Sequence, residues 1–495
     1  MLLEMAAAGF GERVAVQNGP DRLTYAELFA AAGAARRRIE ASGASHVGIL
    51  DVNSLAVPVG LFAAAWAGRP FVPLNYRLTA EEVDALLTRI APAYLVTAPE
   101  RVERLSAHAG ASAVARDRFL AGLAGAEPAK NDWPADPDAV AVLLFTSGTT
   151  GAPKAAVLRN RHLVSYVLGS VEFGAASEDE AALVSVPPYH VAAMAAILSS
   201  VYAGRRIVQL ASFSAEAWVE TARLERVTHA FVVPTMLARI VDALELAGGG
   251  LPSLRALSYG GGKMPLPVIE RAMRLLPGVD FTNAYGLTET SSTIALLGPE
   301  DHRSAAASEE SAARRRLASV GRALPGVEIE VRDEDAKAVA PGVPGEIHVR
   351  GEQVSGEYQG RATSLGLGGW FPTRDGGFLD EEGYLFVTGR IDDVIVRGGE
   401  NLSPGEIEDA LHEHPGVADC AVVGVPDEQW GEAVAAVIVP RAGAHPAPEE
   451  LREWVRARLR SSRVPERIEF RDALPYNETG KLLRRKVRAE LAGAA

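Results

Sequence analysis

Residues 143–160, LLFTSGTTGAPKAAVLRN, combine side chains that are suited to holding phosphate. Hydroxyl groups can donate hydrogen bonds to phosphate oxygens, and glycines let backbone N–H groups curl around them. Lys154 adds a positive charge. The segment does not fit the usual phosphate-loop formula G-x-x-x-x-G-K-[ST]. The hydroxyl-bearing and glycine residues of this loop are Thr146, Ser147, Gly148, Thr149, Thr150 and Gly151.

The flanks of this loop predict how it is held. Residues 139–145, AVAVLLF, have the pattern of a buried strand, and residues 155–158, AAVL, resume the apolar character. The loop therefore joins strand to strand, whereas a Walker-type loop opens a helix. A plain Ser/Thr/Gly surface turn is the simpler alternative, but it needs neither so many hydroxyls nor a strand on each side.

Apolar runs alternate with helical patterns along most of the chain, which predicts an α/β fold. Residues 254–262, 267–276 and 279–286 form a strand, helix, strand unit. Loops at the carboxyl ends of such strands build the ligand crevice of open α/β sheets. The stretch 303–316, rich in Ala, Ser and Arg, is interpreted as a surface loop.

The chain of 495 residues is too long for one core, since single cores stop growing at roughly 250–300 residues. Its pattern changes near Arg390. We therefore predict an N-terminal domain over 1–390 and a C-terminal domain over 391–495. The phrase GRIDDVIVRGG (389–399) is either a plain linker or a hinge with chemistry on both sides.

The overall charge excludes one class of partner. The net charge is −13, from 50 basic and 63 acidic residues, so a nucleic-acid binder is not expected.

No run approaches the ~20 apolar residues of a membrane span. Glu4 stands where a secretory signal needs positive charge, so a cytoplasmic protein is expected. The one cysteine, Cys420, is interpreted as an inert strand residue.

Several motifs occur in the order and spacing of the adenylate-forming superfamily, and the chain resembles that family over nearly its whole length. The acyl-CoA synthetase branch is most similar. The resemblance implies an N-terminal domain of layered α/β sheets, a small mobile α+β C-terminal domain and a reaction with ATP in two steps. The motifs are TSGTTGAPK (146–154), YGLTET (285–290), TRDGGFLDEEGYLFVTGRIDD (373–393), RGGENLSPGEIE (397–408) and YNETGK (476–481).

The resemblance assigns the opening loop to the β- and γ-phosphates of ATP. Thr288 and Glu289 resemble the pair that binds a phosphate oxygen and Mg²⁺, and a carboxylate suits such a hard cation. Asp375 and Arg390 match the residues that hold the ribose hydroxyls. The residues that resemble the adenine slot are Gly260, Gly261, Gly262, Tyr285 and Gly286.

The resemblance assigns Lys481 to the first step, in which the carboxylate of the acid attacks the α-phosphorus of ATP. A fixed cation there stabilises the charge that gathers at the α-phosphorus in the transition state. Asp392 matches the hinge residue about which the C-terminal domain rotates. The rotation presents Gly398 and Gly399, beside the coenzyme A tunnel, to the arriving thiol.

The acid itself is left open. His190, Met194 and Ser291 are expected at the acyl pocket, and the neutral residues there suit a fatty, aliphatic or aromatic acid. Coenzyme A is the expected acceptor, with a carrier protein or an amine as the alternative. A non-catalytic nucleotide-binding protein or a P-loop protein that releases phosphate is the third hypothesis.

Two residues depart from the commonest family pattern, and their roles stay open. Arg374 contacts either phosphate or an acidic partner, and Lys263 either meets the substrate or is solvated. The oligomeric state, with a homodimer as one alternative, is open as well.

Overall fold

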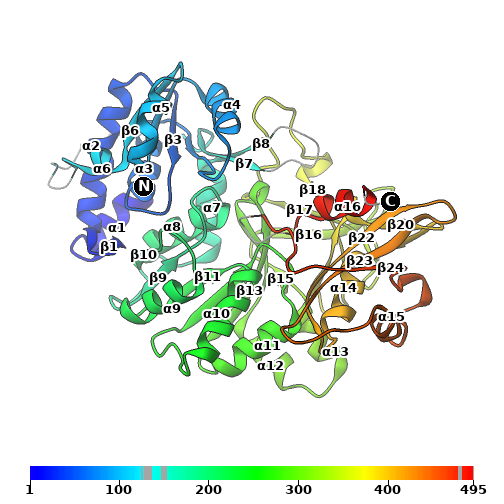
Figure 1. Cartoon of the computed structure of the whole chain (residues 1–495). Coiled ribbons are helices and arrows are strands. Elements are labelled where there is room, and N and C mark those ends of the chain that lie inside the picture. Colours follow the sequence, from blue (N-terminus) through cyan, green and yellow to red (C-terminus); the bar gives the residue numbers. More distant parts are fainter. Residues whose placement is uncertain (124–125, 127–135, 147–152, 478–481, 494–495) are drawn as a thin grey trace.

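Four β-sheets organise the part of the chain that the structure describes. In Figure 1 the first lies among the blue and cyan elements, the second is mostly green with β1 and β2 in blue, the third is yellow-green and the fourth is orange. We call the residues up to Arg390 the N-terminal part and the residues beyond Arg390 the C-terminal part. This computed structural model describes residues 1–123, 126, 136–146, 153–477 and 482–493.

The first sheet carries the predicted phosphate loop. Its strands are β3 (His46–Leu50), β4 (Phe71–Pro73), β5 (Ala93–Thr97), β6 (Ala111–Ala115), β7 (Val140–Thr146) and β8 (Lys154–Arg159). Their order is β6-β5-β3-β4-β7-β8, and they are parallel except that β8 runs antiparallel to β7. The strands on either side of residues 147–152 are therefore confirmed. Those six residues themselves lie outside the described ranges.

The second sheet has nine strands, in the order β15-β14-β13-β12-β11-β9-β10-β1-β2. The strands from β1 through β13 in this order are parallel, while β2, β14 and β15 pair antiparallel at the two ends. The bounds are β1 (Val14–Asn18), β2 (Asp21–Thr24), β9 (Ala181–Val184), β10 (Arg206–Gln209), β11 (His229–Val232), β12 (Ala256–Gly260), β13 (Asp280–Leu287), β14 (Ser292–Leu297) and β15 (Arg322–Ala323).

A hydrophobic cluster joins these two sheets. It includes Val47 and Leu144 of the first sheet and Leu183 and Leu257 of the second, all nearly without exposed surface. The helix over residues 191–203 is apolar around most of its circumference and is buried accordingly. The helices of this region are α1 (Leu2–Phe10), α2 (Tyr25–Ala41), α3 (Ala56–Trp66), α4 (Ala80–Ile90), α5 (Val102–Ser106), α6 (Arg116–Leu120), α7 (Asn160–Ser170), α8 (Val191–Ala203), α9 (Ala215–Leu224) and α10 (Pro234–Leu246).

The strand, helix, strand unit predicted over residues 254–286 is confirmed. Helix α11 (Leu266–Leu275) connects β12 to β13, which pair in parallel. The surface loop predicted at 303–316 was wrong, because this region contains α12 (Pro299–Ala307) and α13 (Ser311–Arg314). Pro299 takes the first helical position of α12, and the Gly298 N–H donates to Asp301 Oδ2 at 3.3 Å. These are helix-start signals that the Ala-rich composition concealed.

The third sheet is antiparallel, with β16 (Val327–Arg332), β17 (Gly345–Gly351), β18 (Phe371–Leu379) and β19 (Leu385–Arg390) in that order. Its apolar face packs on Ile294 and Ala295 of β14. Strand β19 ends at Arg390, where the C-terminal domain was predicted to begin. A short 3₁₀ turn, η5 (Ile391–Asp393), then leads into the fourth sheet.

The C-terminal part has its own sheet and its own buried clusters, separate from the clusters of the N-terminal part. Cys420 is buried in β22. The elements are β20 (Ile395–Arg397), β21 (Glu400–Leu402), α14 (Pro404–His412), β22 (Val417–Asp427), β23 (Gly431–Pro440), α15 (Pro448–Arg456), β24 (Arg467–Phe470) and α16 (Arg484–Ala492).

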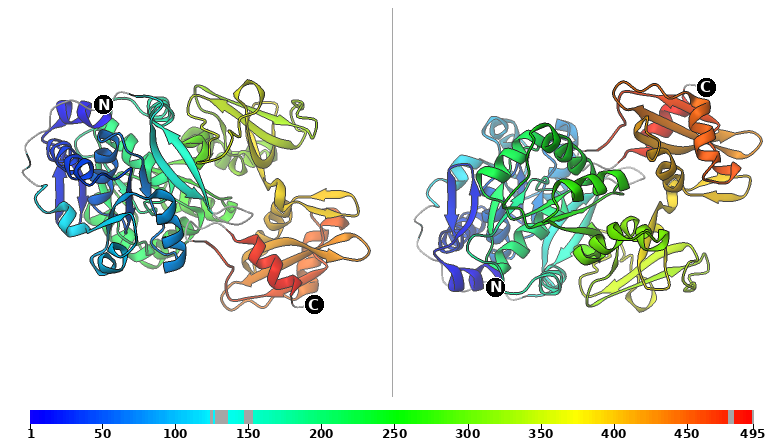
Figure 2. Two further views of the ribbon diagram at one scale, coloured as in Figure 1. Left: turned by 90° about the horizontal axis from the view of Figure 1, so that it is seen from above. Right: turned by 90° about the horizontal axis from the view of Figure 1, so that it is seen from below.

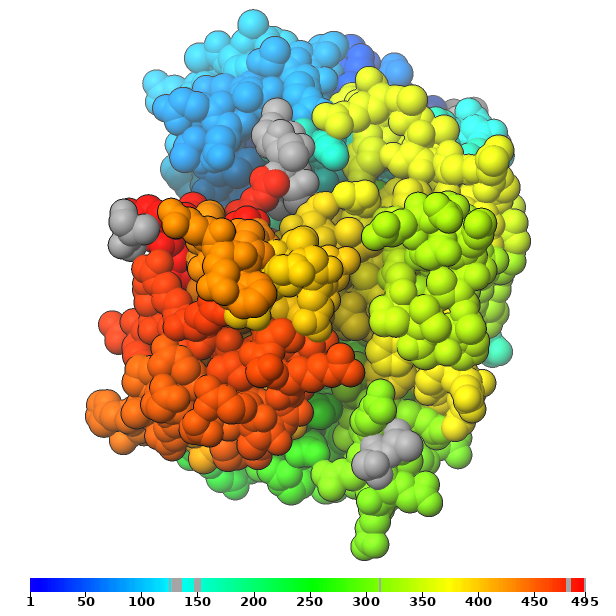
Figure 3. All heavy atoms as spheres, turned by 90° about the vertical axis from the view of Figure 1, so that its right-hand side faces the viewer, coloured from blue at the N-terminus to red at the C-terminus, as the bar shows by residue number. Residues whose placement is uncertain are grey.

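The C-terminal part lies against one side of the N-terminal part. Figure 2 shows it in orange and red, joined to the third sheet by the segment after β19. Figure 3 shows the same part next to the yellow-green third sheet and over green elements of the second. Among the described helices, none has both the length and the apolar character needed to cross a membrane.

A buried ion pair lies between two helices of the C-terminal part. Arg484 of α16 donates to Glu408 of α14 with an Nη2 to Oε2 distance of 2.6 Å, and Glu408 is only 6% exposed. The Val422 N–H donates to the same carboxylate at 2.8 Å. Removal of one partner of a buried pair leaves the other charge without compensation.

We therefore expect Arg484→Met to lower the free energy of unfolding of the C-terminal part by about 3–5 kcal/mol. The double variant Arg484→Met/Glu408→Leu should recover much of that loss, because no buried charge remains. Urea unfolding of both variants measures the effect. A single variant as stable as the unmodified chain would show that the pair does not stabilise this part.

Candidate active site

The carboxylate of Asp375 is the centre of a buried polar cluster. Tyr285 Oη donates to Asp375 Oδ2 at 2.7 Å, and Arg390 Nη1 donates to Asp375 Oδ1 at 2.8 Å. The register of the third sheet pairs Asp375 of β18 directly with Arg390 of β19. Tyr285 comes from β13 of the second sheet. The cluster therefore forms where the second and third sheets meet.

The charge states of this cluster follow from its burial. Burial, and then the neighbouring Asp375 carboxylate, raise the pKa of Tyr285 well above its usual value, so it stays a neutral donor. Burial lowers the pKa of Arg390, but Asp375, together with Tyr285 and Glu289, raises it by more, and the net shift is upward. A carboxylate offers about four acceptor positions. Asp375 thus retains capacity to accept hydroxyl groups from a ligand.

Two of the predicted adenine-slot glycines are required by close backbone contacts. A Cβ on Gly260 would lie 2.1 Å from Ala284 O, and one on Gly286 would lie 1.7 Å from Ser292 O. Only glycine permits β12, β13 and β14 to approach in this way at these positions. Gly261 and Gly262 follow directly at the carboxyl end of β12. The slot residues and Asp375 are therefore brought to one edge of the sheets.

Glu289 lies in a short 3₁₀ turn, η2 (Thr288–Thr290), directly after β13. It is 9% exposed, and Tyr358 Oη donates to its Oε1 atom. The Nζ of Lys154 lies 5.4 Å from the centre of the Tyr358 ring. Tyr358 therefore contacts both Lys154, at the end of the predicted phosphate-binding motif, and Glu289, the predicted metal ligand.

Sequence reasoning missed Tyr358 because no motif marks it. Its position depends on pairing between distant segments, in which Tyr358 forms an isolated β-bridge with Ala156 of β8. The Gln359 N–H also donates to Ala155 O at 2.9 Å. An aromatic residue between two glycines, each two residues away in GEYQG (356–360), was the only available signal.

The donor set around Glu289 fits a magnesium ion. Mg²⁺ takes oxygen ligands and is usually held by one or two carboxylates together with substrate phosphates. Glu289, with the Thr288 hydroxyl beside it, would hold the ion, and Tyr358 would orient the carboxylate. The hydrogen bond from Tyr358 leaves further acceptor positions on Glu289 for a cation.

The predicted acyl-binding residues lie on two elements. His190 caps helix α8, with its Nδ1 atom accepting from the Ala192 N–H at 3.2 Å. Burial lowers the pKa of His190 to about 4, so its ring is neutral at pH 7. Met194 is fully buried in α8. The Ser291 hydroxyl is buried and has no hydrogen-bond partner among the described residues, so it is free to meet a ligand.

Other predicted residues lie elsewhere or outside the described ranges. Gly398 and Gly399 form the turn between β20 and β21, a hairpin that Figures 1 and 2 place at the outer edge of the C-terminal part. The structure therefore does not bring them to the Asp375 cluster. The predicted site residues that lie outside the described ranges are Ser147, Gly148, Thr149, Thr150, Gly151 and Lys481.

Arg374 and Asp392 contact each other. Arg374 Nη2 lies 2.7 Å from Asp392 Oδ1. Arg374 therefore has an acidic partner within this chain, and this partner is the predicted hinge residue.

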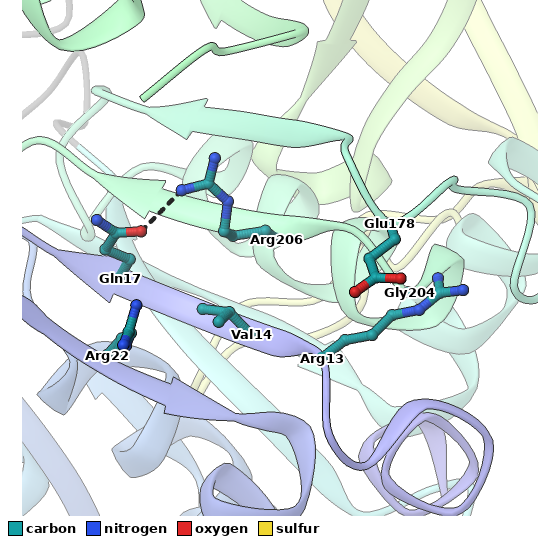
Figure 4. A pocket seen from close by; sticks show the side chains of 7 residues that line it. All are labelled: Arg13, Val14, Gln17, Arg22, Glu178, Gly204 and Arg206. Atoms are coloured by element: carbon teal, nitrogen blue, oxygen red, sulfur yellow. Dashed lines mark hydrogen bonds between the residues drawn. The ribbon is translucent and has the colours of Figure 1, made fainter. Parts of the chain in front are cut away.

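A separate hollow of about 230 Å³ lies beside β1 and β10, far from Asp375 in the sequence and on other strands. Figure 4 shows that Arg206 points to Gln17 there, with a hydrogen bond of 2.7 Å. Arg206 also pairs with Glu225. Its positive charge is thus already compensated. The lining residues are Arg13, Val14, Gln17, Arg22, Glu178, Gly204 and Arg206.

Comparison with known proteins shows the family. The profile of AMP-binding enzymes matches residues 3–359, and that of the AMP-binding enzyme C-terminal domain matches residues 406–481. The chain belongs to the family of AMP-binding enzymes. The predicted family and the predicted α/β fold class are therefore confirmed.

Named relatives and solved structures agree with this assignment. Feruloyl-CoA synthase of Amycolatopsis sp is 35% identical over 96% of this chain and 95% of its own length. Indoleacetate–CoA ligase of Aromatoleum aromaticum is 34% identical, over 96% and 94%. The structure of o-succinylbenzoate-CoA synthetase from Bacillus subtilis with its acyl-adenylate intermediate has a TM-score of 0.84 at 29% identity, over 98% of this chain and 97% of that one.

The Tyr358 hydrogen bond leads to a test of the magnesium site. Tyr358→Phe should raise the Mg²⁺ concentration needed for half-maximal activity by about 10-fold or more, because the Glu289 carboxylate loses its orienting donor. Titration of activity with Mg²⁺ at saturating ATP measures this. Tyr384→Phe is the matched control, since Tyr384 Oη donates to a different carboxylate, Asp301, at 2.6 Å. Equal Mg²⁺ requirements in both variants would contradict the role of Tyr358.

Proposed function

We propose that this protein is an AMP-forming acid–CoA ligase that activates an aromatic carboxylic acid. The observation that carries the proposal is the buried cluster of Asp375, Arg390 and Tyr285, with Glu289 on the turn directly after β13. The carboxylate of Asp375 suits the ribose hydroxyls of ATP, and that of Glu289 suits a cation bound to the phosphates. The relatives named above all make acyl-CoA or aryl-CoA products by their printed names.

The first step of the proposed reaction joins the acid to AMP. A carboxylate oxygen attacks the α-phosphorus of ATP, and the bond to the β-phosphate oxygen breaks to release pyrophosphate. Asp375 and Arg390 hold the ribose hydroxyls, and the segment 146–154 holds the departing phosphates. Bound Mg²⁺ would neutralise phosphate charge. Lys481 stabilises the charge that develops at the α-phosphorus.

The second step transfers the acyl group to a thiol. The thiol sulfur attacks the acyl carbon, and AMP leaves. In this proposal residues 391–495 form the mobile domain and rotate about Asp392, so that Gly398 and Gly399 come to the site. One pocket then serves both steps.

The proposed acid is aromatic because relatives with aromatic substrates in their names include feruloyl-CoA synthase and indoleacetate–CoA ligase. His190 is neutral and Ser291 offers an unpaired hydroxyl, which suits an uncharged ring with a polar substituent. A role in fatty acid metabolism, a cytoplasmic location and a homodimer stay predictions.

A different acceptor is the second candidate. The fatty acid–[acyl-carrier-protein] ligase of Streptomyces coeruleorubidus is 32% identical over 95% of this chain and 92% of its own length. The structure of an amide bond synthetase from Marinactinospora thermotolerans has a TM-score of 0.86 at 29% identity, over 99% of both chains. A carrier protein and an amine are thus the alternatives to coenzyme A.

The role of Lys481 can be tested on the separate steps. Lys481→Ala should lower acyl-adenylate formation by about 10²–10³-fold, because the lost interaction belongs to the transition state. ATP binding, and thioester formation from a pre-made adenylate, should persist. Lys337→Ala, on an exposed turn, is the control. An equal loss in both steps would contradict the assignment of Lys481 to adenylation alone.

The acid and the acceptor can be identified together. We expect a panel of aromatic, aliphatic and fatty acids, incubated with ATP, Mg²⁺ and coenzyme A, to give CoA thioesters of aromatic acids. Mass spectrometry of both adenylates and thioesters is the measurement. Parallel reactions contain an acyl carrier protein or an amine in place of coenzyme A. Adenylates without any CoA thioester, together with an amide or an acylated carrier, would overturn the choice of acceptor.

A further inference from the structure

Lys263 connects the candidate nucleotide site to the C-terminal part. It follows the glycines at the carboxyl end of β12, and its Nζ atom donates to Gly405 O at 3.1 Å. The same Nζ lies 2.5 Å from Asp409 Oδ2. Both partners belong to α14. The sequence left open substrate contact and solvation for Lys263; the structure adds a third partner, because the ammonium group is bound by α14.

Further contacts hold the start of α14 against the N-terminal part. Ser403 Oγ donates to Thr388 O of β19 at 2.8 Å. A Cβ on Gly405 would lie 2.8 Å from the same carbonyl oxygen, so the first turn of α14 sits directly on the backbone of β19. Helix α14 is therefore seated in a defined position, and Lys263 pairs with its Asp409 one turn further along.

A second ion pair lies at the hinge itself. Arg374 of β18 pairs with Asp392 of η5 at 2.7 Å. Arg374 has a left-handed backbone, with φ +62°, and its N–H donates to Glu346 Oε1 at 3.1 Å. Two cations of the N-terminal part, Lys263 and Arg374, are thus paired with acids of the segment that is proposed to rotate.

These contacts hold the C-terminal part in an orientation that keeps the β20–β21 hairpin away from the candidate site. The β20–β21 hairpin points away from the first and second sheets in both views of Figure 2. Its Gly398 N–H donates to Trp430 O at 2.7 Å, within the C-terminal part. The glycines proposed to receive the thiol are therefore outside the site, as expected for the arrangement that performs adenylation.

We propose that Lys263 is a positioning residue for the reaction. By pairing with Asp409 it holds the C-terminal part in the adenylating orientation, and this pair must separate before thioester formation. The inference rests on the proposed two-step function. Both side chains of the pair are about half exposed, at 41% and 53%. An exposed pair shifts an equilibrium by only about two- to fivefold, which suits a contact that must form and break in each cycle.

The test compares Lys263→Met, Asp409→Asn and the exchanged pair Lys263→Glu/Asp409→Lys in the full chain. Lys337→Met, which removes an exposed lysine paired with Asp335, is the matched control. Three rates are measured, at low and at high salt. They are acid-dependent exchange of pyrophosphate into ATP, thioester formation from a pre-made adenylate, and trypsin cleavage in the segment from Arg390 to Arg397.

We expect each single variant to slow pyrophosphate exchange by about two- to fivefold, without slowing thioester formation from the adenylate. Trypsin cleavage of the hinge segment should become faster by a similar factor. The exchanged pair should restore both values toward those of the unmodified chain. High salt should reduce the difference between the single variants and the unmodified chain, because it screens the pair.

Other results would overturn the inference. If Lys263→Met raises the KM for the acid while Asp409→Asn does not, Lys263 contacts substrate instead. If neither variant changes the ratio of the two rates or the cleavage rate, the pair does not set the orientation. Trypsin cleavage needs no catalysis, so it reports on the pair even if the unmodified chain forms no adenylate, a result that would contradict the proposed function alone.

Discussion

The Asp375 carboxylate is buried, and a buried carboxylate must be paired. Its two partners, Tyr285 and Arg390, come from different sheets, so the carboxylate is satisfied only where the second and third sheets meet. Such pairs contribute little net stability after desolvation, but they fix the geometry of the groups that take part. The place where a ligand can meet Asp375 is therefore set by the same contacts that join the two sheets.

The same strand that supplies Arg390 also leads into the hinge. Four residues, 391–394, separate β19 from β20 of the fourth sheet, and they include Asp392, which pairs with Arg374. Lys263 extends from the glycine turn of β12 to α14. At both places, a residue of the proposed nucleotide site is next in the sequence to a residue that contacts the C-terminal part. Gly262 precedes Lys263, and Arg374 precedes Asp375. In the proposed two-step function, a change in orientation of the C-terminal part would act directly on the proposed ribose and adenine sites.

Sequence reasoning succeeded where the signal is local. The strands around the phosphate loop, the β12 to β13 unit and the partners Asp375 and Arg390 all follow from apolar runs or from contiguous motifs. It failed where the position depends on distant segments. Tyr358 reaches Glu289 only because its segment pairs with β8, and the partner of Lys263 depends on how two parts of the chain pack. The helices at 299–314 were missed because their start signals precede the Ala-rich stretch.

The exchange of labelled pyrophosphate into ATP tests the central claim most directly. If the cluster around Asp375 holds ATP for attack by a carboxylate, the purified chain with Mg²⁺ and a suitable aromatic acid returns label from pyrophosphate to ATP, and only when the acid is present. Release of orthophosphate from ATP, with no acid-dependent exchange for any acid tested, would contradict an adenylating enzyme and favour a nucleotide-hydrolysing one.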